Sequence, residues 1–108
     1  SRSTPIGIQQ ISSEVPMGFK LGQNYPNPFN PSTKIKFQIP AGSVGRTDVV
    51  SLIIYDILGK QIKTLVDQQL SPGTYEVDFE GSGLPSGTYY YRLTAGSFSE
   101  TKKLTLVK

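Results

Sequence analysis

The stretch from Val49 to Val66, VVSLIIYDILGKQIKTLV, decides between a helical and a β-strand fold for this chain. Its Val and Ile residues favour strands, whereas its Leu, Lys and Gln residues are equally suited to helices. Gly59, which follows closely after Asp56, breaks the run into two pieces of strand length, and a glycine in that place is typical of a turn. The stretch therefore predicts a β-hairpin.

Alternation along this hairpin predicts which side chains enter the core. Successive side chains of a strand point to opposite faces, so every second residue of an arm shares one face. Ile53 and Tyr55 are expected on the outer face, which we expect to be partly covered. The inward face carries Val50, Leu52 and Ile54 on the first arm, and Ile62 is central to the second.

The same period-two pattern recurs in four further segments: TKIKFQIP (33–40), SPGTYEVDF (71–79), PSGTYYYRL (85–93) and SFSETKKLTLVK (97–108). The second and third of these resemble each other, because both turn at a glycine, Gly73 or Gly87, and continue with Thr-Tyr. The residues predicted to face inward are Ile35, Phe37, Ile39, Tyr75, Val77, Phe79, Tyr89, Tyr91, Leu93, Leu104 and Leu106. About seven short strands with Gly or Pro at most turns predict an all-β, immunoglobulin-like antiparallel β-sandwich.

The segment NYPNPFNP, residues 24–31, cannot join a helix interior or a central strand, because proline lacks an amide donor and has a restricted φ. Its two aromatic residues, Tyr25 and Phe29, are unusual for a disordered linker. We expect the segment to cross the open end between the sheets, where both rings plug the core. Its prolines would also keep foreign strands from pairing with an edge.

The composition excludes several kinds of chemistry. The 108-residue chain contains no cysteine and no histidine, so Cys- or His-based catalysis and the common structural zinc sites cannot be assembled. We predict no enzymatic activity, no metal and no cofactor. The net charge of +3 comes from scattered basic residues, which favours solvated strand faces over nucleic-acid binding.

Residues 1–16 are predicted to be a linker or leader, because they are polar, include Pro5 and Pro16 and show no sustained period. Residues 17–108 are then one β-sandwich domain. No apolar run approaches the roughly 20 residues that cross a bilayer, and we expect no membrane insertion. The start has no apolar signal-peptide core, which leaves the compartment open.

Three polar or aromatic features have an ordinary structural role and a functional alternative. Asp56 is placed to accept backbone N–H bonds in the hairpin turn, with calcium binding as the alternative. Asp78 and Glu80 share one strand face, whereas hydrolytic carboxylate pairs flank a cleft from separate elements. Tyr90 is expected to pack at a sandwich edge, with stacking on a sugar ring as the alternative.

Four motifs in order resemble the type A C-terminal sorting domain of the type IX secretion system. They are the NYPNPFNP segment, YDILGK (55–60), GTYEV (73–77) and the Lys-rich last strand, and the resemblance spans residues 21–108. The family usually has Trp where Phe79 stands and often Arg where Lys60 stands.

The resemblance implies a non-catalytic domain carried at the end of a larger passenger protein. In the family, the domain guides its passenger from the periplasm through an outer-membrane translocon, and a sortase-type surface peptidase then removes the domain at the cell surface. The residues expected to recognise these partners are Lys102, Lys103, Leu104, Leu106 and Lys108. The alternative is an immunoglobulin- or fibronectin-like accessory module that spaces domains or binds polysaccharide.

Overall fold

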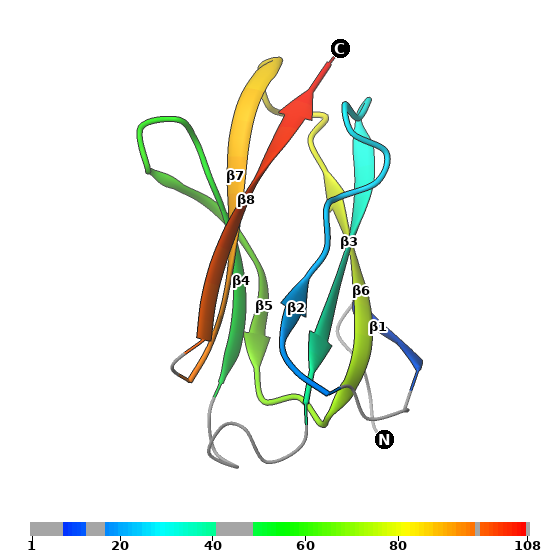
Figure 1. Ribbon diagram of the computed structural model, residues 1–108. Helices are drawn as coiled ribbons and strands as arrows, with labels where there is room; N and C mark the ends of the chain where they lie inside the picture. Colours follow the sequence, from blue (N-terminus) through cyan, green and yellow to red (C-terminus); the bar gives the residue numbers. More distant parts are fainter. Residues whose placement is uncertain (1–7, 13–16, 41–48, 97, 108) are drawn as a thin grey trace.

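The computed structural model describes residues 8–12, 17–40, 49–96 and 98–107 and contains two four-stranded sheets that face each other (Figure 1). The strand order is β1-β6-β3-β2 in the first sheet and β5-β4-β7-β8 in the second, and neighbouring strands are antiparallel. These residues form no helix. The strands are β1 (Ile8–Ser12), β2 (Lys20–Leu21), β3 (Ser32–Ile39), β4 (Val50–Tyr55), β5 (Gln61–Gln68), β6 (Gly73–Glu80), β7 (Gly87–Ala95) and β8 (Phe98–Leu106).

The predicted antiparallel β-sandwich is confirmed, and two short strands upstream of the proline segment are added to those expected. β1 lies within the stretch predicted to be a linker and pairs with β6. β2 has two residues and pairs with β3. β2 is too short to show alternation, and the apolar residues of β1, Ile8 and Ile11, are three positions apart, so neither strand matches the period-two pattern. The boundary at residue 17 stays a prediction.

The core lies between the sheets and contains every inward-facing residue predicted for β3, β4, β6, β7 and β8. Burial of a large apolar side chain contributes about 1.5–3 kcal/mol, so this layer supplies the main driving force for folding. Ile62 is only partly buried, and Val66 is the fully buried residue of β5. The reason is that the pairing of β4 with β5 shifts register twice.

The predicted hairpin of β4 and β5 is confirmed, and Asp56 builds its turn. One carboxylate oxygen of Asp56 accepts hydrogen bonds from the backbone N–H groups of Leu58 and Lys60, both at 2.9 Å. Gly59 has a φ of 84°, a left-handed conformation that glycine adopts without steric cost. The glycine that divides the sequence pattern is therefore required by the turn itself.

The two GTY units occupy equivalent corners, one in each sheet. The Tyr75 hydroxyl donates to the Ser71 carbonyl oxygen and the Tyr89 hydroxyl donates to that of Pro85, both at 2.7 Å. Each hydrogen bond connects a tyrosine near the start of the strand to the carbonyl group four residues earlier in the chain. The internal similarity of the sequence thus marks corresponding corners of a single sandwich.

A buried polar network joins β7 to the chain just before the proline segment. The Tyr91 hydroxyl donates to the Gly22 carbonyl oxygen at 2.7 Å and accepts from the Asn24 backbone N–H at 2.8 Å. The Asn24 side-chain amide donates to Thr33 Oγ1 and to the Pro26 carbonyl oxygen, both at 3.1 Å. Asn24 and Thr33 are almost fully buried, so these bonds replace water for groups that water cannot reach.

Replacing Tyr91 by Phe is expected to lower the free energy of unfolding by about 1–3 kcal/mol, because the buried Asn24 N–H loses its acceptor. Tyr89→Phe is the matched control, since it removes the same atom from the same strand but only one hydrogen bond. Urea denaturation of both variants measures the difference. Equal losses of stability in the two variants would contradict the role given to the network.

Alkaline pH should weaken the fold through the same residue. Burial raises the pKa of Tyr91 to about 12, whereas a phenol in the unfolded chain titrates near about 10. The stabilisation that comes from the protonated phenol is therefore complete below pH about 10 and is lost as the pH rises toward about 12. The stability difference between wild type and Tyr91→Phe should shrink over that range in urea melts. A difference that stays constant would refute this linkage.

Candidate functional site

The last strand, β8, is an edge strand, and it carries four of the five residues predicted to recognise partners. It pairs with β7 on one side, and the opposite edge of the same sheet is β5. Leu104 and Leu106 are buried in the core. Lys103 is exposed, whereas Lys102 is half-buried with its Nζ 3.6 Å from Glu100 Oε2.

These residues do not form one continuous surface. Because successive side chains alternate, Lys102 and Lys103 project to opposite faces of β8, and the two leucines are inaccessible to a partner while the strand stays in place. Lys108 lies outside the described residues. What the fold brings together is the exposed edge of β8 and the segment from Gln23 to Pro31.

The main chain of Phe29 pairs with the outer edge of β8. Its N–H donates to the Thr105 carbonyl oxygen and its carbonyl oxygen accepts from the Val107 N–H, both at 2.9 Å. This bridge is parallel, unlike the pairs within the two sheets. The proline segment thus covers the C-terminal part of the edge, in agreement with the protective role predicted for it.

Two side-chain amides extend this cover where the prolines supply no backbone donor. Gln23 Nε2 donates to the Lys103 carbonyl oxygen at 2.8 Å, and Asn27 Oδ1 accepts from the Thr105 N–H at 3.1 Å. Sequence reasoning missed both contacts. The available signal was the density of Asn and Gln in the segment, because a side-chain amide carries the same donor and acceptor as a peptide group.

Only one of the two rings of the segment plugs the core. Phe29 is 1% exposed, and its ring centroid lies 5.8 Å from that of Phe79. Tyr25 is 81% exposed, so its prediction as a core residue was wrong. The buried residue next to it is Asn24, whose neighbour in an extended chain must point the other way.

A small residue makes room for the Phe29 ring. A Cβ on Gly81 would lie 3.1 Å from Leu106 Cδ2 and 3.3 Å from Phe29 Cε2. The ring and the end of β8 therefore pack against the chain that follows β6. Phe29 links the segment to both sheets.

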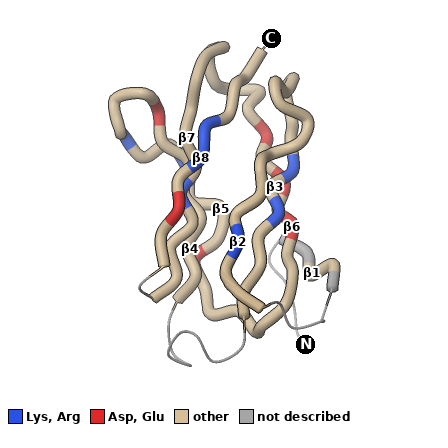
Figure 2. Tube along the Cα trace, viewed as in Figure 1, with Lys and Arg blue, Asp and Glu red and all other residues tan. Residues whose placement is uncertain are grey.

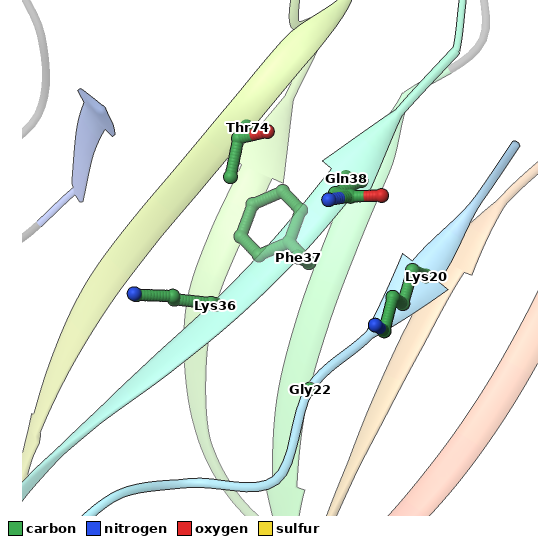
Figure 3. A pocket seen from close by; sticks show the side chains of 6 residues that line it. All are labelled: Lys20, Gly22, Lys36, Phe37, Gln38 and Thr74. Carbon is green, nitrogen blue, oxygen red and sulfur yellow. The ribbon is translucent and has the colours of Figure 1, made fainter. Parts of the chain in front are cut away.

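A shallow hollow lies on the first sheet beside β2 and is lined by Lys20, Gly22, Lys36, Phe37, Gln38 and Thr74 (Figure 3). The two ammonium groups lie on either side of the Phe37 ring in this view and do not converge on one point. The lining holds no acid, so it provides no acid–base pair. Within the described ranges, no cluster of three or more Asp, Glu, His or Cys side chains is placed to hold a metal ion.

The outer face of β3 and β6 carries charges of both signs side by side (Figure 2). Lys34 Nζ lies 2.7 Å from Asp78 Oδ1, and that hydrogen bond raises the pKa of Lys34. Lys36 stands opposite Glu76 in the strand register. Asp78 is thus engaged with a lysine across the strands, and its role at this face is structural.

Comparison with known proteins supports the resemblance noted in the sequence. A family model described as "Secretion system C-terminal sorting domain" matches residues 23–107. A search of curated proteins found no match. The matched region contains the proline segment, the hairpin, both GTY corners and all of β8. This match favours a sorting domain over the accessory module.

The burial of Phe29 can be tested against that of Tyr25. Phe29→Ala is expected to lower the free energy of unfolding by about 3–5 kcal/mol, because it leaves a cavity between the sheets. Tyr25→Ala removes an equally large but exposed ring and should change it by less than about 0.5 kcal/mol. Thermal melts compare the two. If the Phe29→Ala protein had the same melting temperature as the wild type, the ring would not be part of the core.

Proposed function

The chain belongs to the family of secretion system C-terminal sorting domains, and on that premise we propose that β8 is the strand by which the export machinery recognises it. A domain of this family is non-catalytic and directs the secretion of an attached passenger protein by the Por, or type IX, system. The passenger crosses the outer membrane to the cell surface or the medium. Within the described part of the chain, no helix is long and apolar enough to span a membrane.

The partners proposed in detail are an outer-membrane translocon and a surface peptidase of sortase type. The translocon passes the folded domain with its passenger, and the peptidase then removes the domain. Both assignments follow from the resemblance to the family. They require a surface that two large partners can reach.

The observation that carries the proposal is the partly uncovered edge of β8. Gln23 and the proline segment together pair with this edge from Lys103 to Val107. By the alternation of an antiparallel strand, the main-chain groups of Ser99 and Thr101 point to the same edge. No hydrogen bond among the described residues covers these groups, although β2 lies near β8 and the Phe19 ring stacks on that of Phe98 with 4.7 Å between the centroids. We propose that an extended segment of a partner adds to β8 by main-chain pairing at these groups.

The predicted recognition residues divide into two roles on this strand. Leu104 and Leu106 are buried anchors that keep β8 in register, and they become available only if the strand peels away. Lys103 supplies an exposed positive charge beside the open part of the edge, Lys102 lies on the opposite face within 3.6 Å of Glu100, and Lys108 is proposed to extend the basic end of the strand. Charges at an edge prevent self-association while leaving it open to a complementary partner.

The proposal is tested with a passenger fused to this domain in a host that has the secretion system. The double variant Lys102→Ala/Lys103→Ala should reduce surface delivery several-fold, with the passenger retained in the periplasm. Deleting residues 102–108 should abolish delivery, but it also removes two core leucines, so the point variants are decisive.

The matched control is Lys36→Ala/Lys63→Ala, which removes the same charge from exposed positions on β3 and β5. It should deliver the passenger as wild type does. Both purified variants should keep the wild-type melting temperature within a few degrees. Normal delivery by the Lys102/Lys103 variant would reject β8 as the recognition strand.

A further inference from the structure

The outer face of the β5–β4–β7–β8 sheet carries a row of aromatic and basic residues. Register places Gln61 opposite Tyr55, Tyr55 opposite Tyr90, and Tyr90 opposite Lys103, so these four side chains cross the sheet from edge to edge. Tyr55 and Tyr90 are each half-buried. In the part of the chain that the structure describes, Tyr90 makes no ring contact with another aromatic residue. The Tyr90 side chain instead contributes to the lining of a hollow on this face.

Arg92 is exposed, and its guanidinium group lies over the Tyr55 ring of this aromatic patch. Its guanidinium carbon is 5.4 Å from the centroid of the Tyr55 ring, and its Nε donates to Thr101 Oγ1 at 3.1 Å. These two contacts hold the guanidinium in place and leave its terminal N–H groups free to bind an acceptor.

The positive charges of this face have no acidic partner. Neither Arg92 nor Lys103 forms an ion pair with any of the described residues. Across the strands, Arg92 stands opposite Ile53 and Thr101. The opposite sheet differs, because its lysines on β3 face acidic residues of β6 in register. The second sheet therefore presents unpaired positive charge beside aromatic rings, and Asp56 of the hairpin turn adds one negative charge at its border.

The hairpin turn makes this face concave. A hollow between the turn and the sheet is lined by Tyr55, Asp56, Ile57, Gly59, Tyr90, Arg92 and Thr101. The turn that forms its wall is held by the two backbone hydrogen bonds that Asp56 accepts. A carboxylate has about four acceptor positions, so Asp56 retains capacity for a hydroxyl donor of a ligand.

We propose that this hollow binds an acidic saccharide, with a hexuronate ring stacked on Tyr90 and its carboxylate held by Arg92. Tyrosine rings pack against the apolar face of a pyranose, and a guanidinium fork matches a carboxylate. Asp56 accepts from the free hydroxyl groups of a saccharide. The internal sugars of a DNA strand have no free hydroxyl groups, because their 3′ and 5′ oxygens are esterified, so the acceptor on Asp56 favours a saccharide over DNA. The inference does not depend on the sorting function.

The 108-residue chain is titrated with oligogalacturonate while its amide and tyrosine ring signals are followed by NMR. Shifts should concentrate at Tyr55, Tyr90 and Arg92 and saturate. A neutral galacto-oligosaccharide of equal length should bind at least about tenfold more weakly, since it lacks the charge-assisted contact. Equal binding of the neutral sugar, or no binding of the acidic one, would overturn the proposal.

Arg92→Gln should weaken binding of oligogalacturonate by about tenfold, whereas Lys36→Gln, the same change of charge on the other sheet, should leave it within about twofold. Tyr90→Leu tests the stacking while keeping an apolar strand residue, and it should also weaken binding. Equal effects of Arg92→Gln and Lys36→Gln would show attraction by net charge alone. Tighter binding of a single-stranded oligonucleotide than of oligogalacturonate would reject a saccharide site.

Discussion

The pairing of Phe29 with β8 is the interaction on which the rest of the structure depends. Any two-sheet sandwich leaves edge strands whose main-chain groups need a partner or protection. Here one residue meets two requirements: its backbone occupies the edge from Thr105 to Val107, and its ring fills the space between the sheets. The same residue, Phe29, therefore both covers the edge of β8 and closes the core between the sheets.

The buried network around Tyr91 explains how an irregular segment can hold this position. Prolines deprive the segment of backbone donors, so it cannot be secured by a regular ladder of hydrogen bonds. Instead, the Tyr91 hydroxyl and the Asn24 side chain attach it at one end, and the amides of Gln23 and Asn27 attach it to β8. Side chains thereby provide the bonds that the backbone lacks.

The part of β8 that is covered by Gln23 and the proline segment contributes to the stability of the domain, and the part around Ser99 and Thr101 is the one proposed for recognition. The covered half carries Leu104 and Leu106, which the core needs, and the open half carries main-chain groups that the domain itself does not use. Under the proposed function, the partner pairs with these groups beside the Phe19 and Phe98 rings, which pack against the core. The aromatic and basic face beside this edge is separate from it, since it is formed by side chains that stand perpendicular to the sheet.

Strands β3 to β8, their inward faces and the hairpin turn could be predicted from the sequence, because period-two alternation and the glycine after Asp56 are local signals. The family could be identified from motifs for the same reason. The tertiary structure alone decided that Phe29 is buried while Tyr25 is exposed, and that Gln23 and Asn27 cover the edge of β8. These outcomes depend on partners far away in the chain, Tyr91 and Thr105 among them. An irregular segment has no period of its own from which such partners can be inferred.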